Sequence, residues 1–418
     1  MIRSMLSAAS AVRNHQIYMD VVANNIANVN TTAFKSGRVT FRELLTQVLT
    51  PGSGPQIGVR GGVNPIQIGL GMSLGAVDTL FNQGTLQSTG RSSDLAIQGA
   101  GFFVYKGVTQ NLYSRDGSLD LGLDGTLVNP ATGLQVMGWR PDPTTGQIDT
   151  TQPLQTITIP LNQGLVAQQT ENAWVLGNLD SSTTVGGSVT TTIQIYDSLG
   201  ALHNINITFT KEADNTWSWS ASTSEAGVTF ELPDTPQVVF TTAGQYDTTN
   251  NPVENFELTI QGFPNGAVPN QTIRLRLDNL TQLDQAESNI SAGAQDGSGP
   301  GNLVSFSIDS DGKVVGSYSN GMYATVGQVA LATFVNAGGL LRVGDNMFTT
   351  SVNSGAPEIG VAGTGSRGII QAGYLEMSNV DLAQQFTSMI MAQRGFQANS
   401  RVISASDQML QDLVNLVR

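Results

Sequence analysis

The 418-residue chain contains no cysteine, which excludes disulfide bonds, thiolate metal sites and cysteine nucleophiles. It has only two histidines, His15 and His203, and their separation in sequence argues against a metal centre built from several histidines. Charged residues make up 12% of the chain, about half of the usual share of roughly 25%. The net charge of −13 argues against binding nucleic acid or an anionic membrane through a basic surface. No stretch approaches the length of apolar sequence that a membrane-spanning helix needs.

Motifs of nucleotide, metal and hydrolase sites are missing or incomplete. Residues 363–368 match G-x-G-x-x-G, but no strand–helix–strand pattern surrounds them, so we interpret them as a glycine-rich loop. Residues 309–312 begin like a calcium loop, but the glycine comes two positions early and the twelfth residue is Asn320 rather than Glu, so we predict a β-turn. We expect His203 to be a surface residue of a strand rather than a general base. The sequence therefore predicts no enzyme, and no catalytic, metal-binding or cofactor-binding residues.

Glycine and proline are unevenly distributed. All 15 prolines lie between Pro51 and Pro357, the first 36 residues contain no glycine, and Gly395 is the only glycine after Gly373. Because both residues weaken the interior of a helix, the two ends can form long helices and the interior cannot. The ends carry a net charge of +3, so the interior carries −16.

Apolar residues recur at heptad spacing in both ends, which is typical of helices that bury a narrow stripe against other helices. The predicted self-assembly seam contains thirteen residues: Met5, Val12, Met19, Val22, Ile26, Val29, Leu382, Phe386, Met389, Phe396, Ile403, Leu410 and Val417. Asn379 is the predicted N-cap of the second helix. That helix would be roughly 58 Å long, too long to bury its stripe within a compact domain.

We therefore predict that the terminal helices pack with those of other copies and are disordered in the free monomer, because isolated helices are only marginally stable. The alternative is an intramolecular helix pair that packs against the interior.

The interior shows short alternating apolar runs separated by Asp-Gly and Asn-Gly turns, which predict β structure. The expected fold is mainly β with long α-helical termini, and nested β domains are inserted between N- and C-terminal coiled-coil helices. We expect a terminal helical coiled-coil domain, an extended connecting region, an inner β domain, and an outer (middle) β domain with linkers. Their predicted ranges are 1–42 plus 373–418, 43–74, 75–153 plus 303–372, and 154–302.

The run ANNIANVNTTAFK at residues 23–35 resembles the N-terminal signature of bacterial flagellar rod and hook axial proteins. The runs at 373–382 and 391–401 resemble the matching C-terminal signature. Segments at 94–103 and 114–118 are similar to the inner β domain of the family, and segments within 177–200 resemble its hook members. The resemblance assigns twelve signature residues: Asn24, Asn25, Ile26, Ala27, Asn28, Thr31, Phe34, Lys35, Gln393, Arg394, Phe396 and Asn399.

This resemblance implies a structural subunit of the flagellar hook. Such subunits polymerise into a flexible hollow helical tube that acts as a universal joint and transmits torque from rod to filament. The resemblance also implies an extracellular location in the flagellum and export through the flagellar type III apparatus without a cleaved signal peptide. The implied partners are further copies of the chain, the distal rod protein, the hook cap and the hook–filament junction proteins. Nucleic acid and membrane insertion are not expected.

Two alternatives remain open. A distal rod-type axial protein would share both ends but typically lacks a large middle domain. A β-rich surface adhesin or glycan-binding protein would agree with the acidic interior and with Trp217 and Trp219, which share one face of a predicted strand. We interpret that face as a core face, and the terminal heptads would have no purpose in an adhesin.

Overall fold

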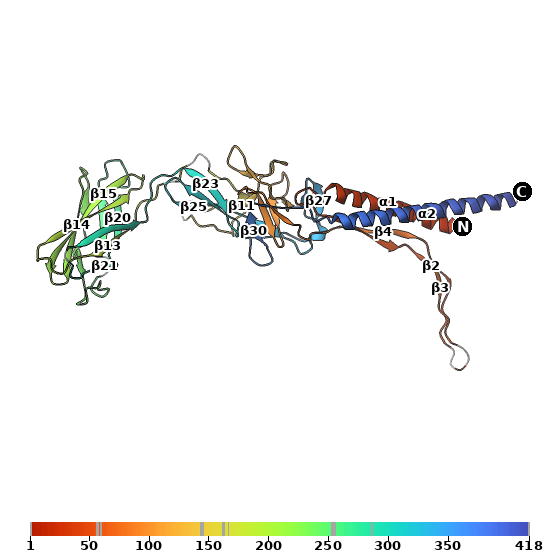
Figure 1. Ribbon diagram of the computed structural model, residues 1–418, viewed down its shortest axis with the longest axis horizontal. Coiled ribbons are helices and arrows are strands. Elements are labelled where there is room, and N and C mark those ends of the chain that lie inside the picture. The colour runs from red at the N-terminus through yellow and green to blue at the C-terminus, as the bar shows by residue number, and fades with distance from the viewer. Residues whose placement is uncertain are drawn as a thin grey trace. The chain divides into compact units, whose positions relative to one another are not determined.

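The computed structural model describes residues 2–55, 58, 61–142, 146–160, 164–165, 167–251, 256–285 and 287–416. An α-helix lies near each end of the chain, and the strands come between them in sequence (Figure 1). The chain divides into two compact units. The first comprises Met1–Ile159, Ser307–Val315 and Thr325–Arg418, and the second comprises Pro160–Phe306 and Gly316–Ala324. The predicted fold class, mainly β with helical termini, is confirmed.

Helices α1 (Ile2–Ala27) and α2 (Leu382–Leu416) belong to the first unit and pack against each other. Asp381 caps α2, because the backbone N–H of Gln384 donates to its Oδ1 (3.1 Å). The prediction of Asn379 as the cap was wrong, since its side chain bonds to backbone groups of the β structure instead. Within the described residues, no helix is long and apolar enough to cross a membrane.

The strands of the first unit form several small sheets. Antiparallel pairs join β1 to β4, β2 to β3, β5 to β31, β6 to β30 and β9 to β10. A six-stranded sheet has the order β27-β28-β8-β7-β26-β29, and a five-stranded sheet has the order β12-β11-β25-β24-β23. The division between the units falls within β23, β24 and β25.

The bounds of these strands are β1 Gly37–Glu43, β2 Thr46–Thr50, β3 Ile66–Gly69, β4 Met72–Thr79, β5 Leu86–Ser88, β6 Leu95–Gln98, β7 Phe102–Tyr105, β8 Leu112–Ser114, β9 Asp120–Leu121, β10 Leu127–Val128, β11 Met137–Trp139, β12 Gln155–Thr156, β23 Leu303–Ile308, β24 Lys313–Tyr318, β25 Tyr323–Val329, β26 Leu331–Thr333, β27 Leu341–Gly344, β28 Met347–Thr349, β29 Glu358–Gly360, β30 Ile369–Ala372 and β31 Tyr374–Glu376.

Two motifs that resemble ligand loops are ordinary connections. Residues 309–312 form the turn between β23 and β24, in which Asp309 Oδ1 accepts the backbone N–H groups of Asp311 and Lys313. Gly312 in this turn has φ +79°, a value that glycine adopts without strain. Residues 363–368 connect β29 to β30 and are closed by the Gly363 N–H, which donates to the Gly368 carbonyl. Both loop interpretations are confirmed.

The second unit contains a four-stranded sheet of order β14-β15-β16-β18 and a six-stranded sheet that includes β17-β19-β20-β13-β21, with β22 paired to β13. Alternate residues of both sheets form one apolar core. Trp217 and Trp219 are fully buried in it, so the interpretation of their face as a core face is confirmed. The bounds are β13 Asn172–Asn178, β14 Ser188–Tyr196, β15 Leu202–Ala213, β16 Thr216–Ser222, β17 Thr229–Glu231, β18 Gln237–Val239, β19 Glu257–Gln261, β20 Asn270–Arg276, β21 Leu280–Thr281 and β22 Asn289–Gln295.

His203 of β15 is buried, so its prediction as a surface residue was wrong. Its Nδ1 lies 2.7 Å from Glu225 Oε2, and its Nε2 lies 3.0 Å from Asp197 Oδ2. The amide of Asn265 also donates to Asp197. Burial of the ring lowers its pKa, but the hydrogen bonds and charges of Asp197 and Glu225 outweigh burial and hold the pKa of His203 above its ordinary value. Because carboxylates face both ring nitrogens, the imidazolium form is the one that this cluster stabilises.

Because of the contacts of His203, we expect the second unit to lose stability as the pH rises above about 6.5. A raised folded-state pKa contributes stability that is fully present below the ordinary histidine value of about 6.5 and is lost as the pH rises through the raised value. Loss of one charged hydrogen bond should cost about 1.5–3 kcal/mol of unfolding free energy. Urea unfolding of the second unit, followed by Trp217 and Trp219 fluorescence at a series of pH values, measures this. The variant His203→Asn should show a flat profile in this range, and an equally steep profile would contradict the assignment.

Candidate assembly surface at the chain termini

Four of the seven predicted seam residues of the C-terminal helix lie along the contact of α2 with α1. Met389, Phe396, Ile403 and Leu410 are half-buried there, each seven residues after the last. The second row of the same stripe consists of Ala392, Asn399 and Ser406, small or polar residues that are at least half-buried. The side of α2 that is turned away from solvent is therefore the side on which the sequence places this heptad row. The small residues of the second row allow the two helices to approach closely.

The remaining seam residues are placed less uniformly. On α1, Val22 is buried, and Met5, Val12, Met19 and Ile26 are half-buried. Val29 lies in the turn that follows α1, and Leu382 and Phe386 at the start of α2 are exposed. Val417 lies outside the described residues. The contacts of the helix pair are made within one chain, as in the intramolecular alternative, so packing of the seam between copies stays a prediction.

Gly395 is a contact residue that the seam pattern did not include. A Cβ atom at this position would lie 2.7 Å from the His15 ring, so only glycine lets α2 approach α1 here without a shift of the ring. The signal was present in the sequence, because Gly395 is the only glycine in the C-terminal helix and His15 is the one polar break in its row of the N-terminal stripe.

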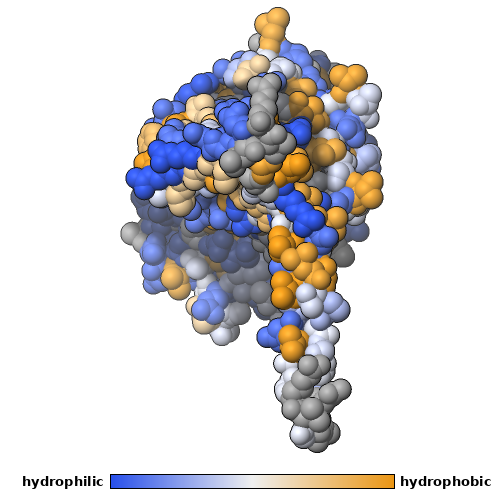
Figure 2. Space-filling view, turned by 90° about the vertical axis from the view of Figure 1, so that its right-hand side faces the viewer, coloured by the Kyte–Doolittle hydropathy of each residue, from blue (hydrophilic) through white to orange (hydrophobic). Residues whose placement is uncertain are grey.

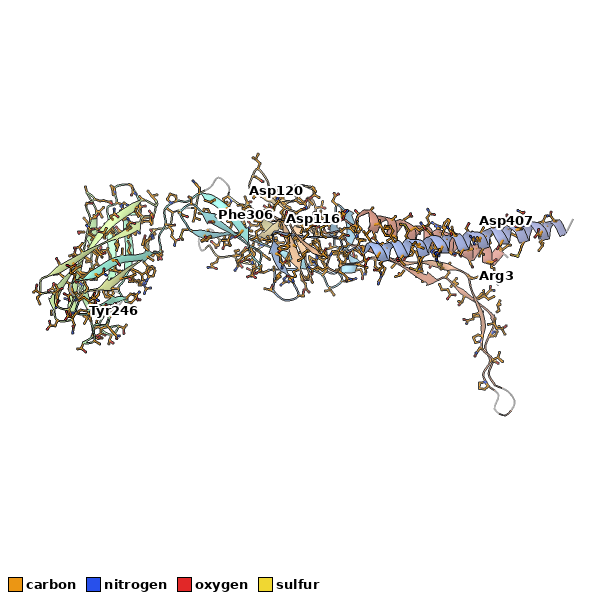
Figure 3. The ribbon with its side chains drawn as sticks, viewed as in Figure 1. Arg3, Asp116, Asp120, Tyr246, Phe306 and Asp407 are labelled. Carbon is orange, nitrogen blue, oxygen red and sulfur yellow. The ribbon has the colours of Figure 1, made fainter. Side chains whose placement is uncertain are left out.

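Much of the apolar surface of the terminal elements remains exposed. On α2, seven large apolar side chains are 42–62% exposed: Phe386, Ile390, Met391, Val402, Met409, Leu413 and Val414. Arg3 on α1 and Asp407 on α2 mark the part of the helix pair near the chain ends (Figure 3). Single exposed apolar residues are ordinary, but seven large ones on one helix indicate surface that another molecule covers.

The β2–β3 hairpin is a second exposed apolar element, and Figure 2 shows apolar surface along it. Leu45, Val48, Leu49, Ile66 and Ile68 are 44–72% exposed. A two-stranded hairpin is at best marginally stable in water, so these side chains need a further surface to pack against. The region predicted as an extended connection, residues 43–74, thus contains paired strands that present apolar side chains to solvent.

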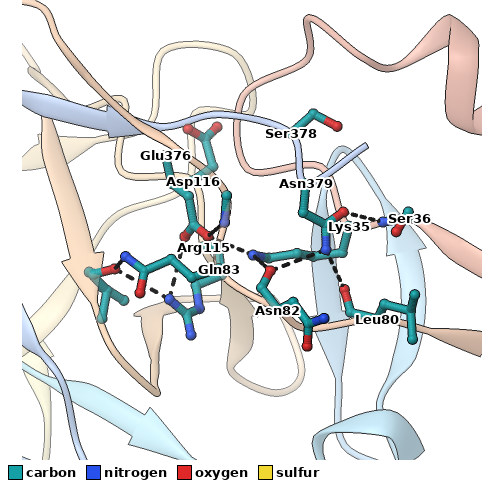
Figure 4. A network of polar contacts seen from close by, with 12 residues as sticks. Lys35, Ser36, Leu80, Asn82, Gln83, Arg115, Asp116, Glu376, Ser378 and Asn379 are labelled. Carbon is teal, nitrogen blue, oxygen red and sulfur yellow. Dashed lines mark hydrogen bonds and ion pairs between the residues drawn. The ribbon is translucent and has the colours of Figure 1, made fainter. Parts of the chain in front are cut away.

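Both family signatures meet at a buried ionic cluster where the terminal segments join the β structure (Figure 4). Lys35 Nζ lies 2.6 Å from Glu376 Oε1, and both side chains are fully buried. Arg115 Nη1 lies 3.4 Å from Glu376 Oε2, and the backbone N–H of Gly84 donates to Glu376 Oε1 (2.9 Å). Lys35 also donates to the carbonyl of Asn82 (2.9 Å). We call Lys35, Arg115 and Glu376 the buried ion cluster.

Desolvation dominates the electrostatics of this cluster. Burial lowers the pKa of Lys35 and that of Arg115, and the charge and hydrogen bonds of Glu376 oppose this in both cases without cancelling it. A carboxylate shared between two buried cations is therefore the group on which the arrangement depends.

Backbone contacts reinforce the junction. Asn379 Oδ1 accepts the N–H of Ser36 (2.8 Å), and its Nδ2 donates to the carbonyls of Leu80 and Asn82. Arg342 donates to the carbonyl of Lys35 (2.6 Å), and its guanidinium lies over the Phe34 ring. The two ends of the chain are thereby fixed to the same β structure.

The other signature residues have separate placements. Asn25 is buried, with its side chain bonded to both backbone groups of Gly37. Asn28 bonds to Asn24 and Thr31 at the end of α1. Ile26 is half-buried and Ala27 is exposed. On α2, Gln393 and Arg394 are exposed and Asn399 donates to the Gly395 carbonyl.

Four family models match the chain in order. They are described as flagella basal body rod protein (residues 5–35), flagellar hook protein FlgE/F/G D1 domain (96–169), flagellar basal body protein FlaE D2 domain (161–298), and flagellar basal body rod FlgEFG protein C-terminal (371–416). The matches at the two ends cover most of both helices and include Lys35 and Glu376 of the buried ion cluster. The D2 match covers most of the second unit.

Curated relatives align over their whole length. The chain is 38% identical to the flagellar hook protein FlgE of Borreliella burgdorferi and 38% identical to that of Treponema pallidum, with 100% of each chain covered in both cases. It is 35% identical to FlgE of Salmonella typhimurium, over 99% of this chain and 100% of the relative.

The helical termini are joined through a common ionic cluster, the β structure comes between them in sequence, and family models match both ends and part of each unit. Together these features define an axial subunit of the bacterial flagellum. Within that class, the chain belongs to the flagellar hook protein FlgE family, and it is a structural subunit of the flagellar hook.

Proposed function

We propose that this subunit polymerises into a flexible hollow helical tube that acts as a universal joint between the flagellar rod and filament. The large exposed apolar side chains of α2 carry the proposal. Leaving these side chains in water is unfavourable. Burying them against other copies stabilises the assembly by roughly 25 cal/mol for each Å² of apolar surface removed from water. The terminal helices would then form the inner layer around a central channel.

The thirteen seam residues would act at two levels. Those that are half-buried between α1 and α2 hold the helix pair of each copy together. Leu382 and Phe386 are exposed and would contact the helices of neighbouring copies. The β2–β3 hairpin would pack its apolar side chains against neighbours in the same way, which gives the connecting region 43–74 a role in assembly.

The division into parts follows from this arrangement. We propose that 1–42 plus 373–418 form the inner helical layer, that 75–153 plus 303–372 form the inner β domain, and that 154–302 form the outer domain. A bent rotating tube requires each copy to lengthen and shorten its contacts once in every revolution. Apolar contacts between helices would hold the tube, and polar contacts between outer domains would slide or break.

The partners and location belong to the same proposal. The subunit would be extracellular and would be exported through the flagellar type III apparatus without a cleaved signal peptide. A chain without cysteine can pass through such an apparatus unfolded without forming disulfide bonds, which supports this route. The tube would meet the distal rod protein at one end, and the hook cap and then the junction proteins at the other. Because its relatives are structural hook proteins, we propose no catalytic role.

Electron microscopy of the purified chain under polymerising conditions tests the proposal. We expect short curved tubes with a central channel. Straight rigid tubes would instead support the distal rod-type alternative. A protein that stays monomeric at every concentration and salt condition tried would contradict self-assembly through the terminal helices.

Removing the second unit should alter bending more than assembly. Two backbone hydrogen bonds join Gln168 and Ser298 (2.9 and 2.8 Å), so residues 170–296 can be replaced by a short glycine linker between chain ends that already lie together. We expect tubes still to form through the helices, with a bending stiffness changed at least about twofold, because outer contacts far from the tube axis are lost. Curvature distributions in micrographs measure this. A tube that bends and polymerises unchanged would show that the outer domain has no part in flexing.

A further inference from the structure

Nearly all of the net charge of the chain lies in the second unit. This unit contains fifteen Asp and Glu against three Lys and Arg, a net charge of −12 out of −13 for the whole chain. Of the three cations, Lys211 is buried and Arg274 is paired with Glu257 (2.8 Å). Copies of this unit therefore repel one another, and little free basic surface is left to offset the repulsion. Close contact between two copies requires a surface without charge.

One sheet face of the second unit meets this requirement. Every second residue of β14, β15 and β16 points outward. These residues are Ser188, Thr190, Thr192 and Gln194 on β14, Asn204, Asn206, Thr208 and Thr210 on β15, and Ser218, Ser220 and Ser222 on β16. Each of these eleven positions is Ser, Thr, Asn or Gln. The row of β15 continues outward to Glu212, so a carboxylate stands at one end of this face, where it accepts a hydrogen bond from Ser218. We call these eleven side chains the hydroxyl face.

Cross-strand hydrogen bonds hold part of the hydroxyl face in place. Thr190 Oγ1 lies 2.9 Å from Thr208 Oγ1, and Thr192 Oγ1 donates to Asn206 Oδ1 (2.7 Å). Threonine is restricted at χ1, so ordering these side chains at an interface costs little further entropy. Each hydroxyl has one donor and two acceptor sites, so a bond to its neighbour leaves capacity for bonds to another molecule.

The outward face of the other sheet differs. It carries Glu231 on β17, Glu257 on β19, and Arg274 and Arg276 on β20, among polar residues such as Thr259 and Thr272. A copy that approaches this face meets charges that must be desolvated or matched. The two sheets thus share one core but present outer surfaces of different chemistry.

We propose that the hydroxyl face is the surface through which the second unit contacts a second copy of this chain. This inference rests on the proposed polymerisation and names the contact that the outer domain makes within it. Uncharged hydroxyl and amide groups give many weak hydrogen bonds that exchange with water at small cost, which suits a contact that is remade in each revolution. The face favours a second acidic copy because it adds no charge of its own to their repulsion.

The substitution Thr190→Glu tests the inference against Thr272→Glu as a matched control. Both threonines are exposed and are the third residue of their strand. Each forms a cross-strand threonine pair, Thr190 with Thr208 at 2.9 Å and Thr272 with Thr259 at 3.1 Å. Both variants add one negative charge to the same unit. Sedimentation of polymer gives the critical concentration of each full-length variant. We expect a rise of at least about tenfold for Thr190→Glu and less than about threefold for Thr272→Glu, with the difference reduced at high salt.

The fluorescence of Trp217 and Trp219 reports whether the second unit is folded in each variant. If Thr190→Glu does not fold, Ser220→Glu on the same face takes its place with the same expectation. Equal critical concentrations for the face variant and the control would overturn the hydroxyl face as a contact while leaving polymerisation established. Failure of the unsubstituted chain to form tubes would overturn the inference together with the proposed function.

Discussion

Replacing Phe396 and Ile403 with aspartate will abolish polymerisation and leave both β units folded. The two residues are successive members of the α2 heptad row and are half-buried against α1. A carboxylate at either position would have to be buried without a cation beside it, which costs several kcal/mol. Since each 1.4 kcal/mol is a factor of ten, the critical concentration should rise more than about 100-fold.

Sedimentation and electron microscopy measure the loss of tubes, and tryptophan fluorescence and circular dichroism show whether the β units remain folded. The control places the same charges at two exposed polar positions of the same helix, with Thr387→Asp and Gln408→Asp. That protein should polymerise nearly as the unsubstituted chain does. Tubes of normal length and abundance from the Phe396 and Ile403 double variant would refute the role of the helical layer.

Replacing Glu376 with alanine will destabilise the first unit by about 3–5 kcal/mol, because it leaves two buried cations without their counter-charge. Lys35 and Arg115 both contact this carboxylate, and the Gly84 amide donates to it as well. Urea unfolding followed by circular dichroism measures the loss. Hydrogen exchange at the amides of Ala33 and Gly84, which bond to Glu376, shows whether the change is local to the junction.

The exposed pair Arg38–Asp78 of the same unit supplies the control, since Asp78→Ala should cost less than about 1 kcal/mol. Glu376→Gln keeps the shape of the side chain and removes its charge, so an intermediate loss is expected. An effect of Glu376→Ala no larger than that of Asp78→Ala would mean that the buried ion cluster does not hold the junction.

The sequence predicted the elements whose signal is periodic and local. The glycine-free ends and the heptad row from Met389 to Leu410 predict α2 in its observed phase, and the turn at residues 309–312 is encoded by its own Asp and Gly. The burial of His203 could also have been predicted. It lies in phase with Ile205, Ile207 and Phe209, which face the core.

Contacts between segments that are distant in sequence could not be predicted from the sequence. Lys35 and Glu376 lie within the two recognised signatures, but nothing in either run indicates that the side chains meet, because they are 341 residues apart. Asn379 looked like a helix cap, but its side chain bonds to Ser36 and Leu80, and Asp381, two residues further on, caps the helix instead. Local capping preference cannot decide between two candidates when tertiary bonds occupy one of them.

The sequence by itself determined that this protein has helical ends, a β interior and no cysteine chemistry, because composition and periodicity act along the chain. Only the tertiary structure decided which charges are buried together and which sheet face has uncharged side chains along most of its length. The alternation of β14 to β16 shows which residues face outward, but the pairing of the strands is what gathers eleven uncharged side chains into one surface. A property of a surface belongs to residues that are neighbours in space, and strand register and burial settle which these are.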